Sequence, residues 1–302
     1  MYCKLTRFLG NLVPHREAAI RSRRKICICL ALIISVIVRP SFAAATDLRP
    51  EAAQGFDRYI RLTEKRMTAE VTTGGVFLWV DGLPVPSREE IIARLKRGEV
   101  VSEKMRAPDP SGNTSTPGAL IHHWVGTVFI PGVSLRQVLA RVQDYDHHTE
   151  YYKPEVVKSK TIEHAGNDFK VYLRLKKKKV VTVVLDTEYA VHYHSLDATR
   201  AFSESYSTHI AEINHPDEPN EWAAPEGSGE GFMWRLDSFW RFAERDGGVY
   251  IQCEAISLTR DIPTGLNWLI APFIESIPKE SLEFTLLSTR SAVMRGGAHA
   301  LP

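Results

Sequence analysis

The chain has 302 residues, of which 44% are apolar and 25% are charged, and its formal net charge is +2. A chain of this length can form one large domain or two small ones, and its composition suits a protein that buries a core. A fibrous or low-complexity protein is therefore excluded.

Residues 1–43 have the pattern of a secretory signal peptide. A basic flank at 21–25 precedes about 13 apolar residues, and Ser41 and Ala43 supply the small residues that favour cleavage after Ala43. The apolar run is shorter than the roughly 20 residues that cross a bilayer, which makes an N-terminal membrane helix the weaker alternative. We expect an exported protein, periplasmic or extracellular, with the Sec and twin-arginine routes both open.

Removal of this segment changes the chemistry of the rest. It holds eight of the 38 basic residues and one of the 36 acidic residues, so 30 basic and 35 acidic residues remain, with a net charge of −5. An acidic protein lacks the electrostatic attraction for nucleic acid, and we expect no such partner. Of the four cysteines only Cys253 remains, so the fold must depend on its hydrophobic core without an internal disulfide.

Residues 44–117 are expected to form a small, mostly helical lead-in that ends in a linker. Apolar residues recur at helical spacing over 50–71, and Ser87 followed by Glu90 forms a capping-box pattern for a second helix. The segment VFLWVDG between them is strand-like. Three prolines and two glycines in 106–118 indicate the linker, and the boundary is placed there.

The pattern changes to β-branched and aromatic alternation after residue 118. It predicts seven strands, separated by turns such as AGND and RDGG. A helical insertion capped by Ser134 follows the first strand, and a long helix spans about 265–293. A short disordered tail is expected at 296–302. The predicted strands are 120–130, 156–164, 169–176, 180–194, 200–213, 232–244 and 249–260.

This order of a strand, helices, six strands and a long helix resembles the START-like, or SRPBCC, superfamily, which includes the StAR-related lipid-transfer domains. The resemblance covers 118–295, and its nearest local match is the run at 252–286. It implies an α+β helix-grip fold, in which a curved, seven-stranded antiparallel sheet surrounds the C-terminal helix. It also implies a cavity between sheet and helix that takes lipids or other apolar molecules.

The C-terminal helix is apolar enough to be compared with a membrane anchor. Its apolar residues recur at steps of three and four, which gives one broad stripe that needs an apolar sheet opposite it. Pro272 is expected to bend the helix. We therefore predict an internal helix that contributes Leu269, Phe273 and Ile277 to the cavity.

Alternation along the strands predicts which side chains face this helix. In 180–194 the odd positions are apolar or aromatic, whereas the even ones include acids and histidines; in the last strand both sets are apolar, and its register stays open. Tyrosine and tryptophan among aliphatic residues suit an apolar pocket with a few polar groups. The candidate strand residues for ligand binding are Tyr189, Tyr193, Phe202, Glu204, Tyr206, Trp234 and Trp240.

Glu204 is the one carboxylate expected on the inner face, where it must be paired, hydrated or raised in pKa. It is the candidate acid or base if the protein is a cyclase- or hydrolase-like enzyme on this fold. The alternative is that a bulge or register slip turns Glu204 outward, or that Arg235 or Arg241 pairs with it near the rim.

Other polar runs point to no cofactor or metal. His192 and His194 share a strand face, but that face carries acids and should be solvated, and no metal motif accompanies them. The lysines at 176–179 fit a solvated hairpin tip, which leaves transient contact with anionic lipid headgroups open. The acidic stretch 217–231 is a candidate gate.

We expect an exported, soluble carrier of a lipid or other hydrophobic ligand. The alternatives are an enzyme that uses Glu204 and an envelope interaction module with a filled cavity, in which Trp268 and Phe273 pack against Trp234. The ligand, the export route and the oligomeric state stay open.

Overall fold

The computed structural model describes residues 47–73, 75–106, 114–179, 181–262 and 267–298, with no account of the side chains at 73, 267–275, 297 and 298. The expected signal peptide and the end of the expected tail lie outside this part. Residues 45–302 form one compact unit.

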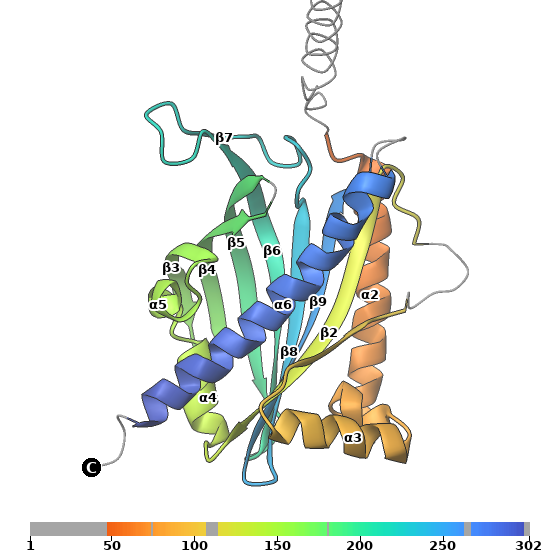
Figure 1. Ribbon diagram of the computed structural model, residues 1–302, viewed down its shortest axis with the longest axis vertical. Helices are drawn as coiled ribbons and strands as arrows, with labels where there is room; N and C mark the ends of the chain where they lie inside the picture. Colours follow the sequence, from red (N-terminus) through yellow and green to blue (C-terminus); the bar gives the residue numbers. More distant parts are fainter. Residues whose placement is uncertain (1–46, 74, 107–113, 180, 263–266, 299–302) are drawn as a thin grey trace, which may run out of the picture. The chain divides into compact units, whose positions relative to one another are not determined.

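The strands of the described residues form a nine-stranded antiparallel sheet (Figure 1). Its order is β1-β2-β9-β8-β6-β5-β4-β3, with β7 beside β6. All seven expected strands are present, and two short ones, β1 and β7, add to them. The strands are β1 (Val101–Lys104), β2 (Ala119–Pro131), β3 (Val156–Ala165), β4 (Asp168–Lys178), β5 (Thr182–Ser195), β6 (Arg200–Asn214), β7 (Trp222–Ala223), β8 (Arg235–Arg245) and β9 (Gly248–Arg260).

The long helix α6 (Asn267–Ala298) crosses one face of this sheet, which we call the inner face (Figure 1). Leu282, Leu286 and Val293 are buried against it. Gly126 of β2 permits the close approach, because a Cβ atom there would lie 2.7 Å from a terminal methyl of Leu286. The helix-grip architecture is thereby confirmed. Within the described residues, no helix combines the length and apolarity that crossing a membrane requires.

The insertion after β2 closes one end of the inner face. Ser134 caps α4 (Leu135–Val142) as expected, since its hydroxyl accepts from the backbone N–H of Gln137. A 3-10 turn, η2 (Tyr145–His147), and the short α5 (His148–Tyr151) follow. Apolar residues of α4 join those of β2, β9 and α6 in the largest core cluster.

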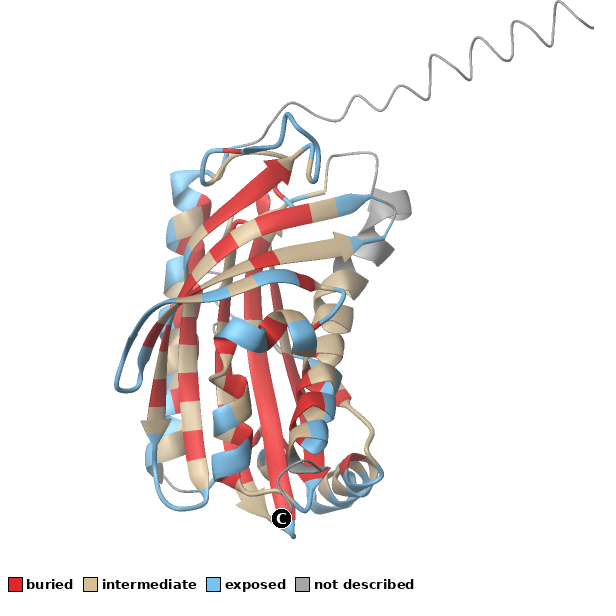
Figure 2. Ribbon diagram, turned by 90° about the vertical axis from the view of Figure 1, so that its left-hand side faces the viewer, coloured by how far each residue is buried: buried red, intermediate tan, exposed pale blue. Residues whose placement is uncertain are grey.

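Helix α2 (Pro50–Thr73) covers part of the opposite, outer face (Figure 1). Its Phe56 and Ile60 belong to one buried cluster with Ile256 and Leu258 of β9. The other set of alternating side chains of β9, which includes Cys253, points to the inner face, toward α6. Strand β9 is therefore covered on both sides, which explains why both of its side-chain sets are apolar; the burial along the sheet is visible in Figure 2.

The segment before α3 differs from its expected form. VFLWVDG is not a strand: it contains a 3-10 turn, η1 (Trp79–Gly82), because its polar contacts are made by side chains rather than by a neighbouring strand. The N–H of Trp79 donates to the Gln252 side chain at 2.6 Å, and that of Leu78 donates to Asp81 at 3.0 Å.

The predicted capping box at Ser87 and Glu90, which was to begin α3 (Val85–Lys96), was also wrong. The helix begins two residues before Ser87, with Pro84 at the N-cap and a proline in the first turn, where a missing N–H costs nothing. Helix α3 packs with η1 beneath Phe129 and Tyr250 of the sheet.

Candidate functional site

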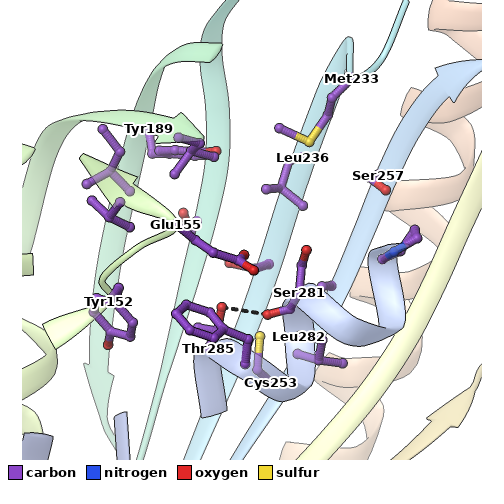
Figure 3. Close-up of a pocket in the computed structure, with 18 of the residues that line it drawn as sticks. Tyr152, Glu155, Tyr189, Met233, Leu236, Cys253, Ser257, Ser281, Leu282 and Thr285 are labelled. Atoms are coloured by element: carbon purple, nitrogen blue, oxygen red, sulfur yellow. Dashed lines mark hydrogen bonds between the residues drawn. The ribbon is translucent and has the colours of Figure 1, made fainter. Parts of the chain in front are cut away.

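A cavity of about 380 Å³ lies between the inner face of the sheet and α6 (Figure 3). Strands β4, β5, β6, β8 and β9 supply its floor, and α6 supplies its roof. Most of its wall is aliphatic or aromatic. Its apolar lining includes Trp124, Val171, Leu173, Leu185, Tyr189, Val191, Tyr193, Leu236, Trp240, Phe242, Ile277, Leu282 and Phe284.

At one end, which we call the tyrosine end, the polar groups satisfy one another. The hydroxyls of Tyr145 and Tyr193 are 2.8 Å apart, and the Tyr152 hydroxyl lies 3.0 Å from that of Thr289 on α6. Burial lowers the pKa of His148 to about 4, so its ring is neutral at pH 7 and its Nε2–H donates to the Val142 carbonyl at 3.2 Å. This end presents apolar ring surface and no charge.

The opposite end, the loop end, carries the only charged groups that line the cavity among the described residues. Lys176 pairs with Asp217 at 2.9 Å, and Lys177 pairs with Glu155. Lys179, at the same hairpin tip, forms an ion pair with Glu280 of α6. The expected lysine run therefore lies beside the cavity, with three of its side chains neutralised by acids.

The stretch 217–231 leads to this loop end. The Glu212 carboxylate accepts from the backbone N–H groups of Glu230 and Phe232, both at 2.7 Å. Phe232 and Met233, which follow directly, line the cavity, and Phe232 is 41% exposed. The expected gating segment is thus held by a buried carboxylate next to two residues of the cavity wall, one of which is partly exposed to solvent.

Four of the predicted binding residues lie on the cavity wall. Tyr189 and Tyr193 of β5, Trp240 of β8 and Ile277 of α6 all line it. The odd positions of β5 face inward, as alternation predicted. Leu269 and Phe273 fall among the residues whose side chains are not described.

The side chains of the first part of β6 point to the opposite face from the one predicted. The inward placement of Phe202, Glu204 and Tyr206 was therefore wrong. Between Glu188 and Tyr189 the pairing with β5 shifts by one residue, which leaves Thr208 as an extra residue on β6. Such a bulge reverses the alternation beyond it. The even residues of β6 before the bulge therefore face outward.

The outward side chains have partners there. Glu204 lies 3.4 Å from the Nε2 atom of His194, and the Phe202 ring stacks on the same imidazole. The Tyr206 hydroxyl donates to Glu64 of α2 at 2.6 Å. The alternative of a bulge that turns Glu204 outward is therefore the observed one, with His194 rather than an arginine as its partner.

Trp234 does not line the cavity either. It is buried in the outer cluster with Phe56 and Leu258. The reason is that β8 begins only at Arg235, so the alternation of the strand does not extend to Trp234.

Sequence reasoning missed several residues that line the floor of the cavity. Ser203 and Ser205 occupy the inner positions of β6, and Cys253 occupies that of β9, which settles its open register. Small polar residues alternating with aromatic ones point to a solvated face, so no local signal identified the serines as inward.

The histidines of β5 lie outside the cavity. His192 bonds to Asp168 at 2.5 Å, and His194 bonds to Glu204. In the described part of the chain, no three potential ligands among His, Cys, Asp and Glu gather as a metal ion would require.

No family model and no curated protein matches this chain in sequence. Solved structures resemble it. A STAR-related lipid transfer protein from Xanthomonas axonopodis is 14% identical, with a TM-score of 0.42, over 64% of this chain and 98% of that one. The Zhui aromatase/cyclase from Streptomyces is 12% identical, with a TM-score of 0.41, over 58% and 95%. Human STARD10 is 10% identical, with a TM-score of 0.40, over 72% and 82%. At such scores the likenesses carry no argument about function, and the architecture rests on the sheet and helix themselves.

Proposed function

We propose that this protein binds a lipid or another largely apolar small molecule in the cavity between the sheet and α6. The observation that supports the proposal is the cavity itself, which has about 380 Å³ of space and a mostly apolar wall. Pockets that hold small molecules have this size and lining. Burial of roughly 400 Å² of apolar ligand surface contributes about 10 kcal/mol, and after the costs of ordering it leaves micromolar affinity within reach.

The enzyme alternative loses its candidate residue. Glu204 is separated from the cavity by the sheet, and it bonds to His194 on the outer face. The closed-module alternative expected a filled cavity, with Trp268 and Phe273 packed against Trp234. The side chains of Trp268 and Phe273 lie outside the described residues, but Trp234 packs beneath α2 and a cavity is present. Binding is therefore the function that the described residues support best.

The test is a substitution that fills the cavity with a large side chain. Binding of a neutral apolar probe, N-phenyl-1-naphthylamine, is measured by its fluorescence. Ala255 of β9 lines the floor, so Ala255→Trp should abolish probe binding. The matched control is Ala190→Trp, at an exposed position of β5, which should bind like the parent protein. Equal binding by the parent and the Ala255→Trp protein would refute the proposal.

We also propose that residues 1–43 direct export and are removed after Ala43, on the sequence pattern alone. Mass spectrometry of the protein recovered from the envelope of a bacterial host tests this. A mass that starts at residue 44 is expected, and retention of the whole segment would contradict it. Transient contact of the lysine-bearing hairpin with a membrane stays a prediction.

A further inference from the structure

Hydroxyl side chains of β6, β8, β9 and α6 interrupt the apolar wall of the cavity, and three of them, all serines, gather on the neighbouring strands β6 and β8. Ser205 of β6 lies directly across from Ser238 of β8 in the strand register, and Ser203 is the next inner residue of β6. We call these three residues the serine cluster. They come from two adjacent strands, so the cluster is a continuous patch.

The serine cluster reaches from the tyrosine end to the middle of the cavity. Ser203 pairs with Tyr193, at the tyrosine end, and Ser205 pairs with Val191, one step further along β5. The inner face of β5 then continues through Tyr189 to Leu185, near the loop end. A molecule that fills the cavity therefore passes over Ser205 and Ser238 with its middle.

These hydroxyls have unused hydrogen-bonding capacity. Ser203 is only 2% exposed and Ser205 only 9%, yet neither side chain makes a hydrogen bond within the described part of the chain. Buried polar groups are normally hydrogen-bonded, so these groups indicate a polar atom on whatever occupies the cavity.

The charges around the cavity indicate that this polar atom is uncharged. Both lysines on the wall are already paired with carboxylates, at Asp217 and Glu155. His148 donates its ring N–H to a backbone carbonyl at the tyrosine end. A carboxylate or phosphate buried midway would have no cation to pair with, and an unpaired buried charge is strongly unfavourable.

We propose that the ligand is a neutral, mainly apolar molecule with a hydroxyl or carbonyl oxygen near its middle, held by the serine cluster. This proposal rests on the proposed function, because it names the chemical class that the same cavity takes. It excludes a plain hydrocarbon chain and a fatty carboxylate as the best-fitting ligands.

The experiment compares two matched probes, methyl stearate and methyl 12-hydroxystearate, as competitors of N-phenyl-1-naphthylamine. They differ by one mid-chain hydroxyl. We expect the hydroxylated ester to bind about tenfold more tightly, since a hydrogen bond to an otherwise unpaired buried group contributes on this scale. Ionised stearate should bind more weakly than either ester.

Variants assign the preference to the serines. The triple variant Ser203→Ala/Ser205→Ala/Ser238→Ala should bind both esters equally and should keep its affinity for methyl stearate, which also shows that it is folded. The control Ser195→Ala changes an exposed serine at the end of β5 and should keep the preference.

Equal binding of the two esters to the parent protein, or a preference that survives in the triple variant, would overturn the proposal and leave the proposed function standing. Failure of the probe and of both esters to bind would overturn the proposed function, and this proposal with it.

Discussion

Glu254 of β9 and His123 of β2 are hydrogen-bonded at 2.6 Å on the outer face of the sheet, with side chains only 2% and 4% exposed. The other ring nitrogen of His123 lies 2.8 Å from the Tyr59 hydroxyl, and Arg66 donates to Glu254. Burial alone would raise the pKa of Glu254, but the hydrogen bond to His123 and the nearby cationic charges outweigh it and lower the pKa. This network joins α2 to the sheet.

Glu254→Ala should lower the free energy of unfolding by about 3–5 kcal/mol, because it leaves His123 and part of Arg66 buried without their acceptor. Urea denaturation at pH 7 measures the change. The control is Lys170→Ala, which removes an ion pair whose lysine side chain is 41% exposed and should cost less than about 1 kcal/mol. Similar losses in the two variants would show that the network adds little.

Asp237 should make the protein less stable as the pH rises from about 4 to 7. Burial raises the pKa of Asp237 to about 6, against the opposing hydrogen bonds from Ser207. A carboxyl that holds its proton more tightly in the folded than in the unfolded state stabilises the fold fully below about pH 4, and this contribution is lost as the pH rises through 6. The loss amounts to about 3 kcal/mol.

The Asp237→Asn variant cannot ionise at this position. Subtracting the unfolding free energy of the parent from that of the variant therefore cancels the contributions of all other titrating groups. The difference in unfolding free energy, variant minus parent, should increase by up to about 3 kcal/mol between pH 4 and pH 7. A difference that is constant with pH would show that Asp237 titrates at its ordinary pKa.

Glu212→Ala should loosen the segment that carries Phe232 and Met233. The carboxylate bonds the amides of Glu230 and Phe232, and hydrogen bonds to a charged group contribute about 1.5–3 kcal/mol each. Amide hydrogen exchange at these two positions should accelerate at least tenfold. Glu218→Ala, at an exposed acid of the same stretch, should leave both rates unchanged. If the cavity binds as proposed, release of the fluorescent probe should also become faster.

Gly126→Val should separate α6 from β2. Even a Cβ atom at this position would lie 2.7 Å from Leu286 and 3.1 Å from Leu282, so a branched side chain overpacks the helix–sheet contact. Overpacking of this kind costs about 1–3 kcal/mol, measurable as a lower thermal midpoint. Gly75→Ala meets no atom within 4 Å and serves as the control. An unchanged midpoint in Gly126→Val would mean that the helix shifts freely on the sheet.

Local patterns in the sequence determined the type and order of most elements. Alternation identified seven of the strands, Ser134 marked the start of α4, and the apolar stripe of α6 indicated a helix that lies on a sheet. These predictions succeeded because periodicity and capping depend on residues within a few positions of one another. The inward tyrosines of β5 followed from the same alternation.

Contacts between distant segments decided the rest. The bulge at Thr208 depends on how β6 pairs with β5, and the outward Tyr206 is covered by Glu64, 142 residues earlier in the chain. Since α2 covers the outer face, aromatic residues are favourable on either side of β6 and hydrophobicity could not identify the inner one. Which face of β6 lines the cavity, and with it the placement of Glu204 and the serine cluster, was therefore fixed by tertiary packing.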